Sequence, residues 1–284
     1  MTDANKTIAF QGAPGAYSDL ACRAVHPEME TLPCHTFEDT FAAVLDGRAK
    51  FAMIPIDNTV AGRVADIHHL LPDSNLLIVG EHFQRVDHHL LALPGTKIEE
   101  LTHVHSHVHA LPQCRKVIRE LGLEPVVYAD TAAGAEMIAK QGIRNHAAIA
   151  SELAGKIYGL ESLRANIEDA EHNTTRFLIM TKEADFPDPD ERPWVTSFVF
   201  KVRNVPAALF KAMGGFATNG VNMTKLESYM VDGNFAATQF YAEIDGHVGD
   251  KSVALAMEEL GFFTSWVKVL GVFPAHPFRQ KEAS

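Results

Sequence analysis

Short apolar runs alternate with helical patterns over the first 180 or so residues of the chain. The runs are rich in β-branched and aromatic residues, as in strands, and each precedes apolar residues spaced three and four apart, as on one face of a helix. The predicted strand and helix pairs are 8–11 with 17–25, 51–56 with 64–71, 126–128 with 132–140, and 147–150 with 152–158. This alternation is typical of a mostly parallel α/β sheet. The apolar stretch 76–93 could cross between two lobes, so we predict two α/β lobes with a cleft.

Three prolines and a cluster of acidic residues interrupt every helix and strand period between Glu183 and Pro193. Proline removes a backbone donor and ends regular structure, so this composition indicates a linker at 183–194. We therefore expect an N-terminal domain at 1–182. Its two lobes should cover approximately 1–80 with 170–182, and 85–169.

After the linker the pattern changes to that of a second, smaller domain at 195–275, followed by a polar tail at 276–284. Strands are predicted at 195–202, 221–230, 235–244 and 266–272, and helices at 206–217 and 252–260. Asn204 should begin the first helix, Gly261 should close the second, and Asp232-Gly233 is a hairpin signal. The order is βαββαβ, the ferredoxin-like arrangement. A domain this small suggests a regulatory or dimerising role.

Composition excludes several classes of protein. Of 284 residues, 46% are hydrophobic and 21% charged, which is ordinary for a globular protein with a full-sized core. A net charge of −11 without a basic block disfavours nucleic acid and anionic membrane as partners, although a small anionic substrate remains possible. Three cysteines without a C-x-x-C spacing argue against disulfides and thiolate zinc sites. No signal-peptide or membrane-spanning pattern occurs, so we expect a cytoplasmic protein.

Small polar residues stand at four predicted strand-to-helix turns: Ser18, Asn58 with Thr59, Thr131, and Ser151. Such turns offer backbone N–H groups and a hydroxyl or amide at the positive end of a helix, which suits a carboxylate or phosphate. Each residue taken alone is more simply an N-cap. Loops at the carboxyl ends of strands converge in an α/β fold, so together these turns could line a pocket for an anion.

The segment Asn173-Thr-Thr-Arg-Phe177 enters the apolar run 178–180, a predicted strand. Arg176 suits a carboxylate, and the hydroxyl of Thr175 could donate a hydrogen bond to a leaving group. Strand alternation would separate Thr175 and Phe177 from Arg176 across two faces, unless the strand begins only at Phe177. An ordinary strand end at the surface fits the spacing equally well.

Other kinds of site find little support. Alternation on a strand would place His105, His107 and His109 on one side, yet no acidic residue accompanies them and no H-E-x-x-H pattern occurs, so we expect no metal. No G-x-S-x-G motif marks a hydrolase. The loop Gly12-Ala-Pro-Gly15 follows a strand but lacks G-x-G-x-x-G and the Walker lysine, so it is not a nucleotide loop.

Six ordered segments resemble motifs of the prephenate dehydratase family along almost the whole catalytic region. They are Phe10-Gln-Gly-Ala-Pro-Gly-Ala-Tyr-Ser18, Pro55-Ile-Asp-Asn-Thr-Val-Ala-Gly62, Ser106-His107 with Gln113-Cys114, Asp130-Thr-Ala-Ala-Gly-Ala135, Ala150-Ser-Glu-Leu-Ala154 and Asn173-Thr-Thr-Arg-Phe177. The resemblance implies a two-lobed catalytic unit like type II periplasmic binding proteins and a C-terminal ACT domain. It also implies loss of water and carbon dioxide from prephenate to give phenylpyruvate, without a cofactor.

By this resemblance Thr175 would be the catalytic hydroxyl and Arg176 a residue of the substrate site. The other residues that would line the cleft are Ser18, Asn58, Thr59, His107, Gln113, Thr131, Ser151, Glu152, Asn173 and Phe177. Asp57 stands where the family has glutamate and should alter packing more than chemistry.

Two segments of the family's ACT domain contact phenylalanine, and both are altered in this chain. The corresponding residues are Ala207, Ala208 and Leu209, and Asn222, Leu226, Glu227 and Ser228. Ala207 replaces a glycine, and Tyr229 and Met230 replace an arginine and a proline, which changes the charge and shape of the pocket. We expect phenylalanine to be an effector; the alternative is an ACT domain kept for dimerisation only.

Two other functions remain open. Arogenate dehydratase performs the same elimination on a substrate with an amino group in place of the keto oxygen. A non-catalytic sensor would combine a periplasmic-binding-like fold with an ACT domain. ACT domains commonly pair, so a homodimer or homotetramer is expected.

Overall fold

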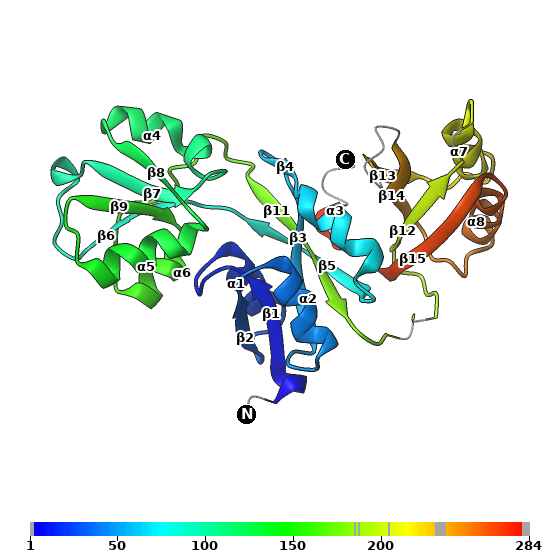
Figure 1. Cartoon of the computed structure of the whole chain (residues 1–284), viewed down its shortest axis with the longest axis horizontal. Coiled ribbons are helices and arrows are strands. Elements are labelled where there is room, and N and C mark those ends of the chain that lie inside the picture. Colours follow the sequence, from blue (N-terminus) through cyan, green and yellow to red (C-terminus); the bar gives the residue numbers. More distant parts are fainter. Residues whose placement is uncertain (1–2, 185, 187, 204, 231–236, 280–284) are drawn as a thin grey trace. The chain divides into compact units, whose positions relative to one another are not determined.

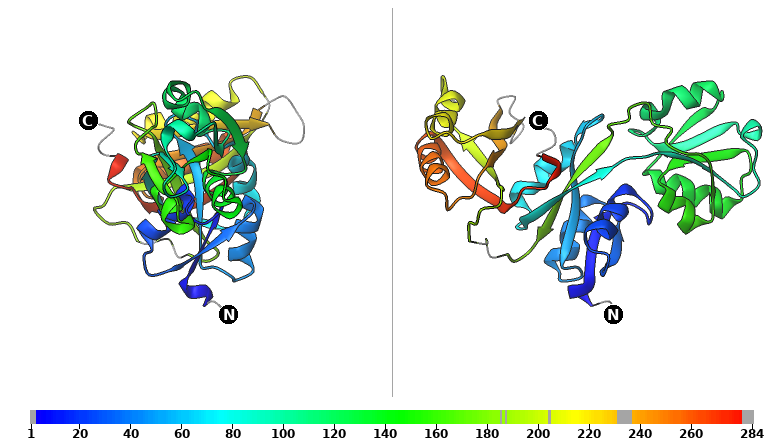
Figure 2. Two further views of the ribbon diagram at one scale, coloured as in Figure 1. Left: turned by 90° about the vertical axis from the view of Figure 1, so that its left-hand side faces the viewer. Right: turned by 180° about the vertical axis from the view of Figure 1, so that it is seen from behind.

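The computed structural model describes residues 3–184, 186, 188–203, 205–230 and 237–279. Contacts divide the chain into two compact units, Met1–Val64 with His82–Phe177, and Ala65–Glu81 with Leu178–Ser284. Figures 1 and 2 show the elements of each. Two strands, β5 (Leu77–Arg85) and β11 (Thr174–Thr181), run from one unit into the other.

The first unit begins with a mainly parallel sheet. Strand β1 (Thr7–Gln11) pairs in parallel with β2 (Glu30–Cys34) and β3 (Phe51–Asn58), and β4 (Gly62–Arg63) pairs antiparallel with β3. Helices α1 (Tyr17–Val25) and α2 (Phe37–Leu45) pack against these strands, and a 3₁₀ helix, Ala4–Lys6, precedes them. Ile8, Ala9 and Phe10 are fully buried. Consecutive buried residues show that both faces of β1 are covered, which is why the strand is apolar at every one of these positions.

A second sheet in this unit has the order β10-β6-β9-β7-β8. Its elements are β6 (His89–Ala92), β7 (His103–His107), β8 (Glu124–Tyr128), β9 (His146–Ala150), β10 (Glu161–Arg164), α4 (Arg115–Glu120), α5 (Thr131–Gln141), α6 (Glu152–Tyr158), and the 3₁₀ helices Ile98–Glu100 and Leu111–Cys114. Val104 and Ile149 pack toward α4, while α5 and α6 cover the other face (Figure 1). Because helices cover both faces of parallel strands, the predicted α/β class is confirmed.

The second unit contains a four-stranded antiparallel sheet of order β13-β14-β12-β15. Its elements are β12 (Trp194–Val202), α7 (Ala208–Thr218), β13 (Met223–Met230), β14 (Ala237–Asp245), α8 (Lys251–Phe263) and β15 (Thr264–Pro274). Phe198, Phe200 and Phe216 form part of the core between the sheet and the two helices. The predicted βαββαβ order is confirmed.

The segment 65–81 belongs with this second unit by its contacts, although the sequence placed it in the first lobe. It contains α3 (Ala65–Leu70), the 3₁₀ helix Leu71–Asp73 and the start of β5. Gly271 of β15 pairs in parallel with Ile78, and Lys268 Nζ donates to the Pro72 carbonyl at 2.6 Å. A hydrophobicity pattern cannot reveal such pairing, since it depends on residues almost 200 positions apart.

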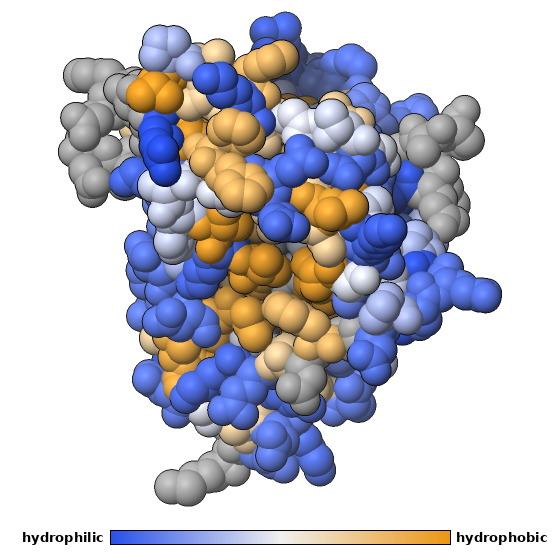
Figure 3. All heavy atoms as spheres, turned by 90° about the vertical axis from the view of Figure 1, so that its right-hand side faces the viewer, coloured by the Kyte–Doolittle hydropathy of each residue, from blue (hydrophilic) through white to orange (hydrophobic). Residues whose placement is uncertain are grey.

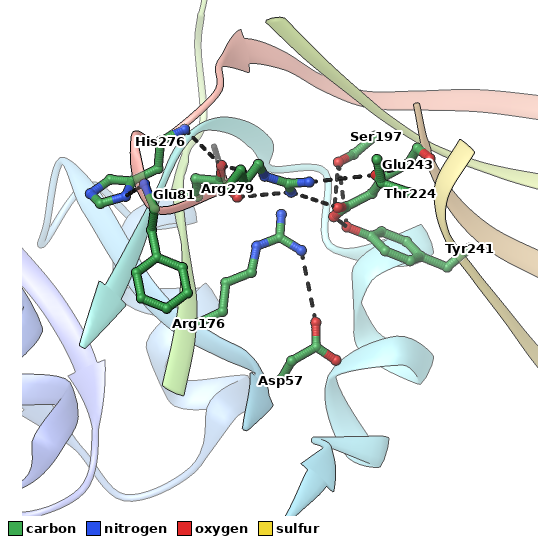
Figure 4. A network of polar contacts seen from close by, with 10 residues as sticks. Asp57, Glu81, Arg176, Ser197, Thr224, Tyr241, Glu243, His276 and Arg279 are labelled. Carbon is green, nitrogen blue, oxygen red and sulfur yellow. Dashed lines mark hydrogen bonds and ion pairs between the residues drawn. The ribbon is translucent and has the colours of Figure 1, made fainter. Parts of the chain in front are cut away.

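A buried ionic network lies within the second unit (Figure 4). The Arg279 guanidinium donates to Glu81 from Nε at 2.7 Å and from Nη2 at 2.9 Å, and to Glu243 from Nη2 at 2.8 Å. The Glu81 and Glu243 side chains are at most 1% exposed. The hydroxyl of Tyr241 donates to Glu243, and the Ser197 hydroxyl also reaches this carboxylate at 3.3 Å. The Arg279 guanidinium therefore bridges two buried carboxylates.

Several predicted boundaries were wrong. Helix α7 begins at Ala208, because Ala207 has a left-handed φ of 61°. Gly261 lies inside α8, which ends only where Thr264 donates to the Leu260 carbonyl at 2.9 Å and β15 begins. His109 lies in a turn beyond β7 and so does not share a strand face with His105 and His107.

Some predictions cannot be compared. Asn204 and the hairpin signal Asp232-Gly233 lie outside the described residues, as do two residues of the linker, while the remainder of 183–193 contains no helix or strand. Elements β2, α2, α4 and β10 were not predicted. Strand β2 is half exposed and carries a proline, so its pattern is weak.

Candidate active site

Thr175 lies near the start of β11, where its hydroxyl joins a cluster of side-chain amides. Asn58, the last residue of β3, donates from Nδ2 to Thr175 Oγ1 at 2.9 Å and to Asn173 Oδ1 at 2.8 Å. Asn173 is 1% exposed and donates from Nδ2 to Gln113 Oε1 at 2.7 Å. The structure thus brings together four predicted site residues from three segments of the chain.

The direction of these hydrogen bonds follows from two backbone amides. The N–H groups of Val60 and Ala61 donate to Asn58 Oδ1 at 2.9 and 2.7 Å. A carbonyl oxygen accepts and an amide nitrogen donates, so the NH₂ group of Asn58 must face Thr175. Since Thr175 Oγ1 accepts this bond, its own proton remains available for a group outside the cluster.

Thr59 fixes the strand on which Thr175 lies. Its hydroxyl donates to the His172 carbonyl at 2.8 Å and accepts from the Thr174 amide at 2.9 Å. Its amide also donates to the Thr174 carbonyl at 3.0 Å. These bonds hold the ends of β3 and β11 together, so Thr59 serves to fix the backbone.

Arg176 lies on the face of β11 opposite Thr175, because the strand begins at Thr174 and successive side chains alternate. Arg176 is 7% exposed; its Nη1 is 3.8 Å from Asp57 Oδ2, and its guanidinium lies 5.9 Å from the centre of the Phe83 ring. Figure 4 shows Arg176 extended toward Asp57. Strand alternation therefore separates Arg176 from the Thr175 hydroxyl, as one reading of the sequence expected. Phe177 is 1% exposed and packs in the core.

Two residues that the sequence did not single out extend the cluster behind Gln113. His88 Nε2 lies 3.1 Å from Gln113 Oε1, and His88 Nδ1 lies 2.9 Å from the Tyr17 hydroxyl. The Tyr17 hydroxyl also lies 2.6 Å from the Asp87 carbonyl. His88 is 1% exposed, and burial lowers its pKa. Tyr17 lies inside the first motif and His88 in a histidine pair, the only sequence signals that could have indicated them.

The loop around Gly15, which precedes the helix that contains Ser18, is tied to the second sheet of the same unit. Ser151 caps α6 by accepting from the Ala154 amide at 3.0 Å, and its hydroxyl donates to the Gly15 carbonyl at 2.5 Å. Gly15 has a φ of +89°, and a Cβ there would lie 2.7 Å from Ala154 Cα, so only glycine permits this approach. Ser151 and Ser18 are 1% and 8% exposed, respectively. Both are buried in the structure.

The N-cap of α5 is Asp130, not Thr131. Its Oδ1 accepts from the Ala133 amide at 2.8 Å, and its Oδ2 accepts from the Ala13 amide at 3.1 Å. Thr131 lies in the first turn and is 8% exposed. Ser18 likewise is not the cap of α1, which begins after Ala16 without a side-chain cap. From the sequence, Thr131 was expected at this turn, although Asp130 begins the same motif.

Two further predicted residues occupy more open positions. His107 ends β7; burial lowers its pKa, His109 lowers it further, and Asp130 opposes both. Glu152 is exposed on α6 and pairs with Lys156 at 2.8 Å, a hydrogen bond that lowers its pKa. In the part of the chain that the structure describes, neither residue hydrogen-bonds to Thr175 or to its amide partners.

The histidines of β7 and β9 form a stack, not a metal centre. His105 Nε2 lies 2.8 Å from His146 Nδ1, and the rings of His103 and His146 are 4.5 Å apart. Burial lowers the pKa of His105 to about 4, with help from His146 and His103. Within the described ranges, no group of three or more His, Cys, Asp or Glu residues could hold a metal ion.

The residues predicted to contact phenylalanine lie in the second unit. Ala207 precedes α7, Ala208 is buried at its start, and Leu209 packs against the core. Asn222 donates from Nδ2 to Asp245 at 2.7 Å, and Glu227 pairs with Lys225 at 3.5 Å. Leu226 and Ser228 face outward from β13.

Comparison with known proteins shows the family to which the chain belongs. Residues 8–185 match the family Prephenate dehydratase. A Komagataeibacter europaeus protein named bifunctional N-acyl-homoserine lactone acylase/prephenate dehydratase is 53% identical over 97% of this chain and 98% of its own length. An Arabidopsis thaliana arogenate dehydratase/prephenate dehydratase is 37% identical over 96% of this chain and 73% of its own.

Among solved structures, the prephenate dehydratase from Arthrobacter aurescens in complex with L-Phe superposes with a TM-score of 0.86 at 27% identity, covering 98% of this chain and 97% of that one. No helix in the described part of the chain is long and apolar enough to cross a membrane. The match over more than half of the sequence, with near full-length relatives, shows that this chain is a lyase-type dehydratase that belongs to the prephenate dehydratase family.

Proposed function

We propose that this chain converts prephenate to phenylpyruvate, with Thr175 as the residue that assists loss of the hydroxyl group. The observation that supports this role most directly is the hydrogen bond of 2.9 Å from Asn58 Nδ2 to Thr175 Oγ1. Because the threonine oxygen accepts from inside the protein, its proton is directed outward. A donor held in this way can reach a departing oxygen without first breaking a bond to the protein.

The reaction requires two bonds of the substrate to break. The bond to the ring carboxylate breaks to release carbon dioxide, and its electron pair enters the ring. The bond between ring carbon and hydroxyl oxygen breaks, and that oxygen leaves as water after taking up a proton. Aromatisation supplies the driving force, so the protein needs mainly to orient prephenate and stabilise the negative charge that develops on the leaving oxygen.

Substitution of Thr175 tests the proposal. Thr175→Ala removes the donor, and we expect kcat to fall about 10²-fold while KM changes little, since the bond strengthens mainly in the transition state. Thr175→Ser keeps a hydroxyl at the same place and is the matched control, expected to lose much less. Phenylpyruvate is measured by its ultraviolet absorbance in alkali. Near-normal turnover by Thr175→Ala would refute the role of this residue.

The other residues predicted for the site divide into two groups by their contacts. Asn58, Gln113 and Asn173 belong to the cluster around Thr175, and we propose that they orient its hydroxyl. Thr59 fixes two strand ends and Ser151 fixes the loop around Gly15, while Ser18 and Thr131 are buried in the first turns of α1 and α5. Arg176, paired with Asp57, is then a positioning residue whose contribution should be smaller than that of Thr175.

The substrate could instead be arogenate, because several relatives that are 35–38% identical are named arogenate dehydratases. The two substrates differ in one polar group, a keto oxygen against an ammonium. A site that pairs one of these groups leaves the other unpaired, so kcat/KM should differ by orders of magnitude between them. Failure to act on either would favour a non-catalytic sensor.

A second activity deserves a direct assay because of the 53% identical relative named as an acylase as well as a prephenate dehydratase. Hydrolysis of an N-acyl-homoserine lactone would release a fatty acid and the free lactone amine. Both products are measured by mass spectrometry. Loss of this activity together with that on prephenate in Thr175→Ala would place both at one site.

Phenylalanine should act through the second unit, which we propose to be an ACT-type regulatory domain. The proposal rests on its βαββαβ order and on the Arthrobacter aurescens relative solved in complex with L-Phe. The altered segment around Tyr229 predicts weaker inhibition. Isothermal titration with phenylalanine, compared with Asn222→Ala, tests binding; absence of binding would leave dimerisation as the role of the domain.

The second unit also exposes large apolar side chains, which supports a homo-oligomer. Phe210 on α7 is 80% exposed and Phe262 on α8 is 67% exposed. Figure 3 shows a broad apolar area on the surface. Contiguous exposed apolar surface usually marks an interface. Sedimentation of the wild type against Phe210→Glu separates a dimer or tetramer from a monomer.

A further inference from the structure

The hydrogen-bond chain behind Thr175 ends on two residues that the proposed chemistry does not use, Tyr17 and His88. Their rings meet edge to face, with centroids 5.4 Å apart. His88 is 1% exposed, and its backbone amide donates to Glu168 at 2.9 Å, so the ring has a fixed position. A buried histidine with partners on both nitrogens has a defined protonation pattern, which the surrounding donors and acceptors determine.

The protonation pattern of His88 can be deduced by starting from Asn58, at the other end of the hydrogen-bond chain. Two backbone amides fix the oxygen of Asn58, so its NH₂ faces Asn173 Oδ1. Asn173 must then present its NH₂ to Gln113, which presents Oε1. The same Oε1 lies 3.1 Å from His88 Nε2. Two acceptors cannot share a hydrogen bond without a proton, so His88 Nε2 must carry one.

Tyr17 holds the other side of the ring. Its hydroxyl donates to the Asp87 carbonyl at 2.6 Å, because a carbonyl can only accept, and its oxygen lies 2.9 Å from His88 Nδ1. Tyr17 therefore fixes the position of the imidazole ring through the Asp87 backbone. Burial lowers the pKa of His88, although Gln113, Glu168 and Asp87 oppose this.

We propose that Tyr17 and His88 are positioning residues: Tyr17 holds the His88 ring, and His88 donates from Nε2 to Gln113, so that the amides between Gln113 and Thr175 stay in place. This inference rests on the proposed function of Thr175. The backbone amides of Val60 and Ala61 set the direction of the hydrogen bonds, and the His88 donor supports the other end of the hydrogen-bond chain. Without that donor Gln113 Oε1 loses a partner, and Asn173, Asn58 and the Thr175 hydroxyl are held less firmly.

Kinetics of a conservative and a disruptive variant test the proposal. His88→Leu removes the donor and should lower kcat about 10- to 100-fold with KM within about 3-fold, because only the orientation of the Thr175 hydroxyl is affected. His88→Gln carries an amide donor near the position of Nε2 and should keep kcat within about 5-fold of the wild type. Normal turnover by His88→Leu, or equal damage by both variants, would overturn it.

The neighbouring histidine provides a matched control. His89 is 9% exposed and bonds Ser162 at 2.8 Å, outside the chain of amides. His89→Leu should therefore leave kcat within about 2-fold. Tyr17→Phe removes only an oxygen atom and should lower kcat about 10-fold, which covers the case in which His88→Leu does not fold.

A second measurement does not depend on activity. Nitrogen-15 NMR of labelled histidine, with His88 assigned by the signals lost in His88→Gln, should show a protonated Nε2. A wild-type ring protonated on Nδ1 alone would contradict the proposal. If the wild type forms no phenylpyruvate, the proposed function fails, while the NMR result still decides the tautomer.

Discussion

Arg279 stabilises the second unit by bridging two buried carboxylates, those of Glu81 and Glu243. Arg279→Met keeps much of the side-chain length but removes the guanidinium that donates to Glu81 and Glu243 at 2.7 to 2.9 Å. Both carboxylates are at most 1% exposed, so water cannot replace the lost donors without local opening. Removing one partner of a buried ion pair costs about 3 to 5 kcal/mol.

Proton uptake sets an upper limit on the cost that each carboxylate contributes. A glutamate side chain in water titrates near pH 4.3, so protonating one at pH 7 costs about 4 kcal/mol. The folded variant should therefore bind more protons than its unfolded state, and its stability should rise as the pH falls. Between pH 7 and pH 5 the deficit relative to the wild type should shrink by about 2 to 3 kcal/mol.

Intrinsic fluorescence is well suited to the measurement, because the sequence has two tryptophans and both lie in this unit, Trp194 and Trp266. Urea unfolding at pH 7, 6 and 5 gives the free energy of unfolding of wild type and variant. Arg192→Met removes an exposed pair of similar length, 2.7 Å to Asp190, and should change the stability far less, because water replaces the lost partner. A deficit for Arg279→Met that is below 1 kcal/mol at pH 7, or that does not change with pH, would refute the reasoning.

Two further predictions concern the first unit, and both use unfolding followed by circular dichroism. Gly15→Ala should lower the free energy of unfolding by about 2 to 4 kcal/mol, because its Cβ would lie 2.7 Å from Ala154 Cα. Gly47→Ala is the control: Gly47 has a similar φ but open space around it, so the substitution should cost about 1 kcal/mol. Equal losses of stability would contradict the close approach of Gly15 to Ala154. Burial lowers the pKa of His105 to about 4, so below pH 6.5 the unfolded state binds more protons and stability should fall by up to about 3 kcal/mol on going to pH 4. His105→Leu should lose this part of the slope and the exposed His35→Leu should keep it; an unchanged slope in His105→Leu would show that this ring does not titrate as expected.

Local patterns were sufficient for elements whose burial is uniform along the chain. The strand at 8–11, the helices at 17–25 and 152–158, and the βαββαβ order all agree with the structure, because periodicity reports which face of each element is covered. Strand β2 was not predicted because its apolar residues are few and partly exposed. Helix α4 was not predicted because it has only six residues, of which Val117 and Ile118 are the apolar ones. The prediction that Gly261 ends the second helix was wrong, since a glycine ends a helix only where its own backbone is left-handed.

The candidate site shows the same division. The sequence singled out Thr175, Asn58, Gln113 and Asn173 through motifs, which name residues but give no directions. The structure decided that Arg176 lies on the opposite face of β11 and that Asp130, not Thr131, caps α5. It also added Tyr17 and His88, which are 71 positions apart and meet only after folding.

The sequence by itself therefore determined the α/β class, the ferredoxin-like order of the C-terminal domain and the residue types that the chemistry requires, because these depend on local periodicity and on motifs. Tertiary structure alone decided which side chains share a hydrogen-bond chain and in which direction each bond runs. The reason is physical: the direction of a hydrogen bond is fixed by its neighbours in space, and here it is passed from two backbone amides after β3 through Asn58, Asn173 and Gln113 to a histidine in a distant segment.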